Sequence, residues 1–589
     1  MILIRYVPDL RIAVYSAHCQ WVALAFLMTQ RCCDEGSLML SMNVADGAWL
    51  PVRALPGAQG VDAAFGPPPD WFPGSVVGGY AQALIAAHLI DHVDLPYEAT
   101  ESVVLRNLVA MALRVTGLDR ARGQEWKRLR AGVLAEGRFD ETAVKAYFAE
   151  HRERMWLFDP VRPYRQLPAL REECEEWSPP GKLVYGLPSG NNHVWFDKRD
   201  QDAPVPVHMA VWSLEAVLGI GAGGGCGSRQ VPGRAARSKT AAGPYRNTVS
   251  YFVRGRSLFE TLVLNCPAGM PNGPGEDLAP WETDTLSDPL APGAAAPSGR
   301  VSLLTGRSRH AVLLQPDSKG QFVQRLKLTW AFDAAGDKMA PAVDPFVMHT
   351  HVTDKTGREQ IKPVPADADR ALWRDIDSLL AHTRPSASRA ADPDSPSKSK
   401  QKATTAPPQV FKDLSTGIGA GPGADVLRSA RVRAVSCASK QASDVLWWAA
   451  DSPFPLFRPA GESTLVHATV RAAHTDAEST YALLDRASKQ MALTMCAGNR
   501  KKAASMRWPV DARRLFWDKA EQVFWQAVAD ALDGTPYEPG RFLTVALVAY
   551  DEATAAAAMS PRGMQAVTSG RVILTRSRKN ATRSPHPHD

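Results

Sequence analysis

The C-terminal part of the chain carries three long stretches in which apolar side chains recur at the spacing of an α-helix. They span residues 476–496, 509–534 and 540–559. The middle stretch begins with Pro509 and ends with Gly534, the residue types preferred at the start and just past the end of a helix. Its stripe has a period of about 3.6 residues and consists of Phe516, Ala520, Val523, Ala527 and Ala531. Several such helices joined by short links predict a C-terminal bundle of the four-helix type.

Strand-like and helix-like stretches are mixed before the bundle. Residues 40–55 alternate and turn at Asp46 and Gly47, which predicts an opening pair of strands. Residues 300–315 and 322–332 also have strand character. The helical stretches span residues 81–116, 140–158 and 208–219. We therefore predict an α+β fold, with a large mixed N-terminal domain followed by the helical bundle.

Composition suggests where the parts of the chain begin and end. The predicted parts are an N-terminal extension (1–38), a large α+β domain (39–382), a flexible insertion (383–425), a hairpin region that completes the large domain (426–454), the bundle (455–570) and a basic tail (571–589). The extension does not match a signal peptide, because Ser16, His18 and Gln20 interrupt its apolar run. The insertion is rich in Pro, Ser, Lys and Gly, a composition typical of flexible segments.

Charge and cysteine usage restrict the class of protein. The formal net charge of +7 is compatible with nucleic-acid binding without requiring it. The eight cysteines are scattered and form no C-x-x-C pair, so the sequence predicts reduced thiols rather than a zinc site or a disulfide framework. No apolar run approaches the ~18 residues of a membrane span. These features predict a cytoplasmic protein with no membrane partner.

One glycine-rich stretch matches a cofactor motif by its letters. Residues Gly219–Gly224 satisfy G-x-G-x-x-G, which binds dinucleotides only where a strand precedes it and a helix follows. Here a helix-like stretch precedes it, and the residues that follow are poor helix starters. A dinucleotide-binding oxidoreductase stays as an alternative. Because the P-loop and G-x-S-x-G signatures are also missing, we predict no enzymatic activity and no cofactor. Because the sequence has no H-E-x-x-H motif and no other cluster of metal ligands, we also predict no metal.

Basic residues follow the same glycines. They are Arg229, Arg234, Arg237, Lys239 and Arg246. Consecutive glycines let a ligand approach the backbone closely, and neighbouring cations attract phosphate groups. The stretch is therefore either a phosphate-binding or groove-binding loop or, alternatively, a disordered surface loop.

Residues 435–448 read as a hairpin. Apolar flanks, which end in Trp447 and Trp448, surround a short polar tip from Ser439 to Ser443. Such a hairpin is either an ordinary surface turn or a tip that projects into a partner.

Several segments, in order, resemble the CasA family, the large subunit of the type I-E CRISPR surveillance complex Cascade. The segments are ADGAWLPVRAL (45–55), PSGNNHVWFD (188–197), YFVRGRSLFETLVLN (251–265), LLTGRSRHAVLL (303–314), ALWRDIDSLL (371–380) and SKQASDVLWW (439–448). Together with the bundle, the resemblance covers about residues 40–570. It implies a non-catalytic subunit that recognises the protospacer-adjacent motif, opens the duplex to start guide-RNA pairing and helps recruit a helicase-nuclease. A scaffold subunit that does not read the motif is the remaining alternative.

The resemblance also implies roles for individual residues. A DNA wedge falls on Lys440, Gln441, Ala442 and Ser443; a motif-reading glycine loop falls on Gly221, Gly223, Gly224 and Gly225, with Gly243 as a second candidate. The motif-reading basic side chain falls on Lys327 or Arg325, with Lys338 as a competitor, and a loop at the guide end falls on Asn191 and Asn192. The implied partners are guide RNA, target double-stranded DNA, the backbone, small and guide 5′-end subunits of Cascade, and the helicase-nuclease.

Overall fold

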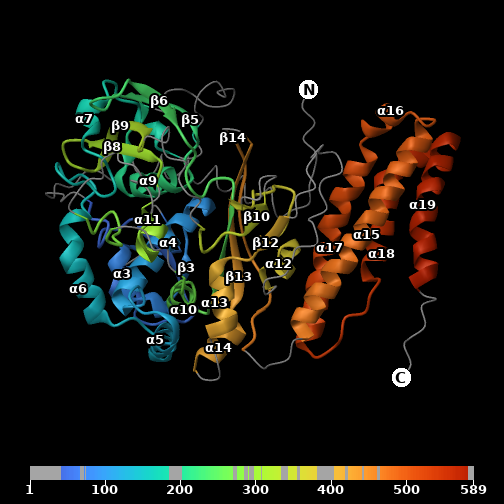
Figure 1. The fold of residues 1–589 in the computed structure, drawn as a ribbon, viewed down its shortest axis with the longest axis horizontal. Coiled ribbons are helices and arrows are strands. Elements are labelled where there is room, and N and C mark those ends of the chain that lie inside the picture. The colour runs from blue at the N-terminus through green and yellow to red at the C-terminus, as the bar shows by residue number, and fades with distance from the viewer. Residues whose placement is uncertain are drawn as a thin grey trace. The chain divides into compact units, whose positions relative to one another are not determined.

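The computed structural model places most of the chain in two compact units. It describes residues 42–66, 72, 74–184, 187, 202–269, 275–283, 290, 297–306, 308–332, 343–353, 359–380, 403–417, 422–440, 443–459 and 465–581. The first unit lies within residues 1–369 and 382–451, and the second lies within residues 370–381 and 452–589 (Figure 1). The first is mixed and the second is helical, so the predicted α+β class is confirmed.

The described strands of the first unit form small antiparallel sheets. Their orders are β2 (Val76–Gly78), β1 (Leu50–Ala54), β3 (Ile90–Val93); β14 (Ser443–Asp451), β13 (Arg431–Lys440), β7 (Val249–Arg254); β4 (Val205–Pro206), β9 (Phe322–Trp330), β8 (His310–Pro316); and β11 (Glu359–Pro363), β10 (His349–Thr353), β12 (Ala403–Ala406). Strands β5 (Gly224–Arg229) and β6 (Arg237–Thr240) form a separate two-stranded ribbon. Neighbouring strands in these described sheets run in opposite directions.

Helices cover and connect these sheets. They are α2 (Val61–Phe65), α3 (Tyr80–Ile85), α4 (Glu98–Thr116), α5 (Gly123–Glu136), α6 (Glu141–His151), α7 (Leu170–Glu173), α9 (Val207–Ile220), α10 (Leu258–Leu264), α11 (Arg300–Thr305), α13 (Gln409–Gly417) and α14 (Pro422–Ser429). The predicted helical stretch 81–116 is wrong at residues 90–93, which form strand β3 paired with β1. Its other parts correspond to α3 and α4, and the helices predicted at 140–158 and 208–219 correspond to α6 and α9. Their apolar periodicity was a sufficient signal because each buries one or more faces.

Helix α4 forms the centre of the first unit because it is buried on all sides. Every residue from Ala99 to Leu113 is buried, and the helix ends at Gly117, whose φ of 71° is the left-handed cap that glycine adopts readily. Within this stretch Arg106 donates to Asp344 (Nη2–Oδ1 2.9 Å), and its guanidinium lies 3.8 Å from the centre of the Tyr245 ring. Paired in this way, the buried charge is compatible with the core. Helix α4 contacts α9, α11 and β13 and so gives them a common base.

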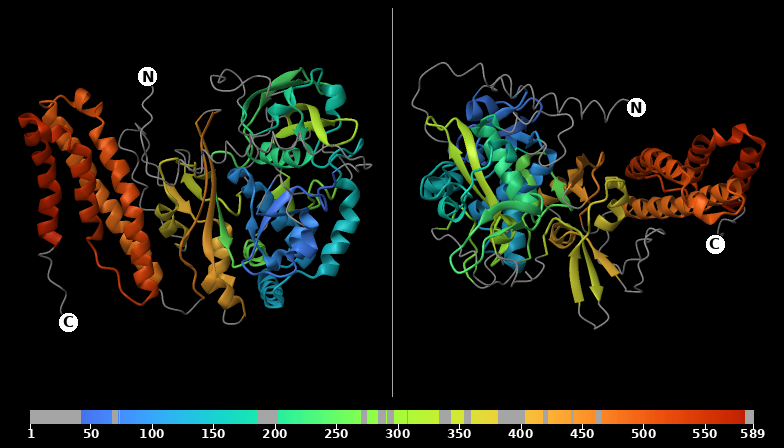
Figure 2. Two further views of the ribbon diagram at one scale, coloured as in Figure 1. Left: turned by 180° about the vertical axis from the view of Figure 1, so that it is seen from behind. Right: turned by 90° about the horizontal axis from the view of Figure 1, so that it is seen from above.

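The sheet of β7, β13 and β14 contains the hairpin that the sequence predicts. Strand β13 pairs with β7 between Arg431 and Ser436, and with β14 between Arg433 and Lys440. Among the described residues, the part of β13 beyond Ser436 therefore has β14 as its only strand partner. Figure 1 shows the two strands running side by side as a long ribbon. The outer half of the hairpin is thus a two-stranded extension of a three-stranded sheet, and Figure 2 gives two further views of it.

Two predicted strands in the first unit are wrong. Residues 300–305 form helix α11, because the Asp277 carboxylate accepts hydrogen bonds from the Val301 and Ser302 amides (3.1 and 2.8 Å) and caps the helix from a distant part of the chain. Residues 44–49 form turns and a bend instead of a strand paired with β1, and the Trp49 indole donates to the Val44 carbonyl (2.8 Å). Strand β1 pairs with β2 and β3 instead.

The predicted flexible insertion at 383–425 also differs from the structure. Residues 403–406 form β12 against β10, and α13 and α14 follow. Helix α13 is held by Val410, Phe411 and Leu414, which are buried. These apolar residues lie at helical spacing in a segment whose composition is otherwise polar, so composition alone was misleading. Residues 381–402 lie outside the described part of the chain.

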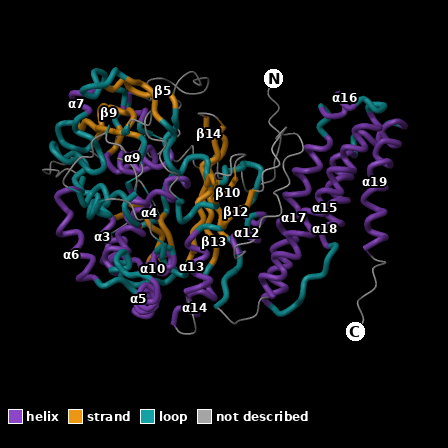
Figure 3. The backbone as a smooth tube through the Cα atoms, viewed as in Figure 1, coloured by secondary structure: helices purple, strands orange, loops and turns teal. Residues whose placement is uncertain are grey.

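The second unit is a helical bundle, as predicted. It contains α15 (Leu465–Met495), α16 (Arg500–Ala504), α17 (Trp508–Leu532), α18 (Arg541–Thr554) and α19 (Pro561–Ala581), with the short α12 (Ile376–Leu380). Helix α15 contacts α17, α18 and α19. Figure 3 shows this unit built from helices and loops.

Two of the predicted boundaries near the bundle need correction. Residues 370–381 belong to the second unit and not to the large domain, because Trp373 lies within 4.9 Å of the Phe524 ring centre and 5.7 Å of that of Trp517. The predicted tail from residue 571 is helical as far as Ala581. Leu574 is buried and Arg571 pairs with Asp551 (Nε–Oδ1 2.9 Å), so this part of α19 packs as the helices before it do.

Candidate nucleic-acid interface

The paired strands β13 and β14, which we name the shaft of the hairpin, pack against helix α4 through the side that carries Trp447. Trp447 packs against a buried cluster that includes Ala99, Val103 and Cys437. Its ring also meets Tyr97 edge-to-face, with 6.0 Å between the ring centres. In the strand register, Cys437 lies opposite Trp447. The tryptophan that the sequence placed just after the tip is therefore a support for the hairpin.

The predicted wedge residues lie at the far end of this shaft. Lys440 pairs with Ser443 in the antiparallel register, and these residues end β13 and begin β14. Gln441 and Ala442, which connect them, lie outside the described residues. The role of these four residues stays a prediction.

A network of ion pairs holds the end of the hairpin far from its tip, around Arg433 and Asp451, which we name the root. The Asp451 carboxylate, at the end of β14, accepts hydrogen bonds from Arg433 (Nη1–Oδ2 3.0 Å) and from Arg254 of β7. Arg433 in turn donates to Glu101 of α4 (Nε–Oε1 3.1 Å), and Arg254 donates to both oxygens of Asp91 in β3 (2.9 and 3.0 Å). These links join three strands of one sheet to α4 and to a second sheet.

The ion pairs at the root affect the ionisation of their members. The hydrogen bond between His92 and Asp91 (3.0 Å) and, after it, the contacts with Arg254 together lower the pKa of Asp91 to about 2, despite the opposing effect of burial. The carboxylates also raise the pKa of Arg433 against the opposing effect of its burial, with Glu101 the strongest of these partners. A cavity of about 20 Å³ borders Arg254, Arg433 and Glu101, which is room for one water molecule. The root is therefore a charged, ordered joint at neutral pH.

The glycines between Gly219 and Gly225, which we name the glycine stretch, differ in whether the fold requires a glycine at that position. A Cβ on Gly221 would lie 2.4 Å from the Val217 carbonyl oxygen, and one on Gly223 would lie 2.7 Å from the Ala242 nitrogen. Gly224 has φ +127°, a conformation that other residues rarely adopt. Gly225 has neither constraint, since its φ is ordinary and a Cβ there would meet no atom within 4 Å. Gly224 and Gly225 are both exposed.

The basic residues that follow the glycines differ in how far the β5–β6 ribbon buries them. Arg229 is buried, donates to Glu173 (Nε–Oε2 2.6 Å) and so fastens the ribbon. Arg246 is buried too. Arg234 and Lys239 are exposed, and Lys239 lies opposite Gly225 in the register. The exposed face of the ribbon thus combines glycine backbone with positive charge, two features that suit contact with phosphate groups.

His310 supports the start of the glycine stretch. Its Nε2 lies 3.0 Å from the Ala222 carbonyl oxygen, and its ring abuts Gly221. Burial lowers the pKa of His310, so the ring is neutral at pH 7 and its Nε2–H donates to the carbonyl. The contact holds the junction of α9 and β5 in place.

Lys327, the first candidate for the motif-reading cation, is buried. Its side chain donates to the carbonyl oxygens of Arg171 (3.1 Å) and Cys174 at the end of α7, and its ammonium lies 4.9 Å from the centre of the Trp177 ring. These contacts complement the negative end of a helix. Its burial argues against direct DNA contact. Arg325, two residues earlier on β9, is exposed.

Other predicted site residues lie outside the described part of the chain. They are Asn191, Asn192 and Lys338. Conversely, sequence reasoning missed Asn247, which has a left-handed φ of 58° and hydrogen-bonds to the hairpin.

The order of elements contradicts the dinucleotide-binding alternative. Helix α9 precedes Gly219–Gly224 and strand β5 follows, which reverses the strand–loop–helix order that the cofactor requires. Within the described residues, no group of His, Cys, Asp and Glu side chains is arranged to hold a metal ion. The same residues contain no helix of the length and apolarity needed to cross a membrane.

Solved structures share this fold over nearly the whole chain. A chain of a CRISPR RNA-guided surveillance complex is 33% identical, with a TM-score of 0.72 over 91% of this chain and 100% of that chain. The CasA (Cse1) structure of Thermus thermophilus is 18% identical, with a TM-score of 0.62 over 91% of this chain and 99% of that one, and shows likeness of fold alone. The fold is therefore that of the CasA class of proteins.

The sequence relationship is equally direct. The profile of the family described as CRISPR-associated protein Cse1 matches residues 79–560, and the chain belongs to this family. CRISPR-associated protein CasA/Cse1 of Thermus thermophilus is 28% identical over 356 residues, which are 57% of this chain and 60% of that protein. The alignment thus spans less than two thirds of that relative. The resemblance inferred from the sequence segments is confirmed.

Proposed function

We propose that this chain is the large subunit of a type I-E RNA-guided surveillance complex and that it recognises the protospacer-adjacent motif in double-stranded DNA. The chain reads the motif, opens the neighbouring base pairs with its β13–β14 hairpin and so starts pairing of the guide RNA with the target strand. The 33% and 31% identity to chains of CRISPR RNA-guided surveillance complexes supports the assembly part of this proposal. The subunit has no enzymatic role, and a recruited helicase-nuclease cuts the DNA.

The observation that carries the motif-reading step is Gly225. It is an exposed glycine whose backbone conformation and surroundings would accept a side chain, and it lies opposite Lys239. A minor groove about 6 Å wide admits a strand of bare backbone more easily than one that carries side chains. Lys239 supplies the positive charge for the adjacent phosphates. Because the minor groove distinguishes base pairs poorly, such a contact accepts several related motifs.

The hairpin supports the opening step. Its outer half extends past β7, while its root is fixed by Arg254, Arg433 and Asp451. A rigid ribbon can separate stacked bases, which costs a few kcal/mol per step, and guide pairing compensates for this cost. In this proposal Gln441, supported by Lys440, Ala442 and Ser443, enters the opened pair.

The same proposal includes the basic side chain, the guide RNA end and the bundle. Arg325 replaces Lys327 as the basic side chain that reaches DNA, because Lys327 is buried. Asn191 and Asn192 contact the guide RNA end, and the helical bundle contacts the small subunits and the displaced strand. These assignments belong to the same proposal.

The first test is binding of a duplex library with a randomised motif by the other Cascade subunits and guide RNA, with and without this chain. We expect a few motifs to be enriched only in its presence. Equal enrichment in both samples would reject motif reading and favour a scaffold role.

Gln441→Ala tests the opening step separately. We expect slower R-loop formation on a fully paired target with unchanged assembly of the complex. R-loop formation at the wild-type rate would assign the opening step to other residues.

A further inference from the structure

One short segment lies between the glycine stretch and the hairpin. Residues 243–247 (Gly-Pro-Tyr-Arg-Asn) lie between β6 and β7, and we name them the strap. The strap makes hydrogen bonds to both of the elements on which the proposed function rests.

The first half of the strap is bonded to the start of the glycine stretch. The Gly243 amide donates to the Gly221 carbonyl (2.9 Å), and the Tyr245 amide donates to the Gly219 carbonyl (3.0 Å). A side chain on Gly243 could not fit, since its Cβ would lie 2.5 Å from the Gly219 carbonyl oxygen. The buried Arg246 adds a bond from Nη1 to the Ile220 carbonyl (3.0 Å). These bonds satisfy the last carbonyls of helix α9 and of the turn that follows it.

The last residue of the strap is bonded to the hairpin. The Asn247 amide donates to the Cys437 carbonyl (2.9 Å), and the Asn247 Oδ1 accepts from the Ser439 amide (3.2 Å). Strand pairing between β7 and β13 stops at Ser436, so these two bonds continue the attachment along the outer half of the hairpin. They are possible because Asn247 adopts a left-handed φ of 58°. Ser439 is two residues before Gln441.

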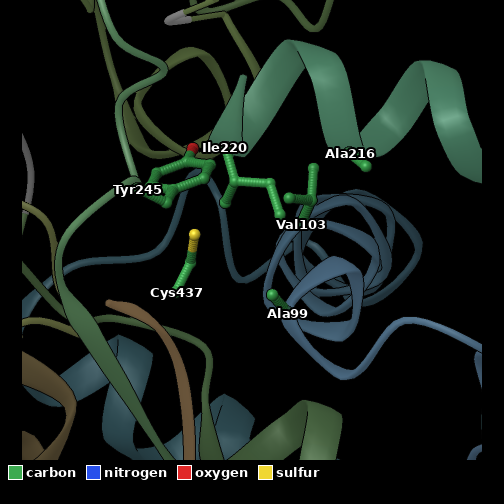
Figure 4. Close-up of a cluster of buried hydrophobic side chains, with 6 residues drawn as sticks. All are labelled: Ala99, Val103, Ala216, Ile220, Tyr245 and Cys437. Atoms are coloured by element: carbon green, nitrogen blue, oxygen red, sulfur yellow. The ribbon is translucent and has the colours of Figure 1, made fainter. Parts of the chain in front are cut away.

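Buried side chains make the junction rigid. Tyr245, Ile220 and Cys437 belong to one cluster with Ala99 and Val103 of α4 and with Ala216 of α9. Figure 4 shows the Cys437 sulfur pointing towards the Tyr245 ring, and Ile220 lying between that ring and Val103. The Tyr245 hydroxyl donates to the Leu304 carbonyl (2.8 Å). The strap, the end of α9 and the inner shaft of the hairpin therefore share one close-packed core, which resists deformation.

We infer that the strap couples motif reading to duplex opening, and that Asn247 is the positioning residue that fixes the hairpin relative to the glycine stretch. This inference rests on the proposed function. In the proposed function the glycine stretch and the hairpin contact adjacent base-pair steps of one duplex. If the distance between the two elements is fixed before DNA binds, the second contact costs no further conformational entropy, and binding is stronger. The strap is the described segment that hydrogen-bonds to both elements.

Two substitutions at Asn247 separate its side chain from its backbone conformation. Asn247→Gly keeps the left-handed φ and the amide bond to Cys437 but removes the acceptor for the Ser439 amide. Asn247→Asp keeps both, since aspartate also tolerates this conformation and offers a carboxylate oxygen. The pair therefore tests one hydrogen bond, with Asp as the conservative control.

The readout is the rate of R-loop formation by the complete complex on two targets. One target is fully paired, and the other has mismatched, already open base pairs next to the motif. On the paired target we expect Asn247→Gly to be about fivefold slower than wild type, the change that corresponds to a net hydrogen-bond contribution of about 1 kcal/mol. We expect Asn247→Asp to stay near the wild-type rate. On the open target, and in motif enrichment, both variants should match wild type.

The outcomes are distinguishable from failure of the proposed function. If Gln441→Ala has no effect on the paired target, the assignment of the opening step to Gln441 in the proposed function is rejected. If Gln441→Ala slows opening but Asn247→Gly does not, the positioning role of Asn247 is rejected. A loss in Asn247→Gly that the open target does not restore, or that Asn247→Asp shares, would reduce Asn247 to a general structural residue and overturn the inference.

Discussion

Replacing Gly225 by Ala should weaken DNA binding without harming the fold. A Cβ at this position would meet no atom within 4 Å, and its φ lies outside the range between +20° and +160°. The native state therefore accepts the methyl group, and the lower entropy of the unfolded chain should raise the free energy of unfolding by about 0.4–1 kcal/mol. The same methyl group would stand between the backbone and an approaching groove. Loss of one such base contact costs about 1–3 kcal/mol, or roughly 5- to 150-fold in affinity.

The matched control is Gly221→Ala. Its Cβ would lie 2.4 Å from the Val217 carbonyl oxygen and 2.7 Å from His310 Cε1, so we expect a loss of about 1–3 kcal/mol of stability from overpacking. Urea denaturation of the chain and titration of the complex with a motif duplex measure the two quantities. Unchanged duplex affinity in a stable Gly225→Ala variant would refute the argument that this glycine is kept for the approach of DNA.

Further predictions concern the cations of β9, the root of the hairpin and the bundle. Lys327→Ala should lower the free energy of unfolding by about 1.5–3 kcal/mol, because two carbonyls lose a charged donor. Arg325→Ala should instead lower duplex affinity at unchanged stability. The reverse pattern in paired denaturation and binding assays would restore Lys327 as the DNA contact. The pKa of Asp91 is lowered from 3.8 to about 2, so its contribution to stability is present above pH 4 and is lost as the pH falls towards 2. Acid titration of the urea midpoint should therefore be shallower in Asp91→Asn, and parallel curves would contradict this. Trp373→Ala should cost the bundle about 3–5 kcal/mol, and an unchanged thermal midpoint would show that residues 370–381 do not belong to its core.

The elements that the sequence predicts correctly are those whose signal is local. Helices α9, α17 and α18 have continuous apolar periodicity, and the hairpin at 435–448 has apolar flanks on both sides of a polar tip. The local sequence of helix α11 predicts a strand, because its cap, Asp277, comes from another part of the chain. In α17 the predicted stripe included Val523, but Phe524 is the buried neighbour, because the helix packs against several partners rather than one.

The candidate site shows the same limit. Sequence letters grouped the glycines from Gly221 to Gly225 together, but only backbone angles and neighbouring atoms distinguish those required by the fold from Gly225. Lys327 and Arg325 are equivalent in sequence, and the alternation of β9 alone would suggest that they face the same way. Both lie near the Trp177 ring, but only Lys327 is buried and donates to the carbonyls of Arg171 and Cys174, whereas Arg325 stays exposed. Asn247 depends on a contact with a strand that comes much later in the chain, which no local pattern reveals.

The bundle is assembled from two separated pieces of chain, and this has a consequence for synthesis. Trp373 leaves the ribosome before the hairpin, whereas its ring partners Trp517, Phe524 and Phe542 follow it. During translation the large apolar side chain of Trp373 therefore lacks its packing partners while β13 and β14 are synthesised and pair with β7. The first unit can therefore fold while the nascent chain is incomplete, but the second cannot close its core until almost the whole polypeptide has emerged. Expression of residues 452–589 alone should give a bundle that aggregates, and addition of a peptide covering residues 370–381 should reduce that aggregation.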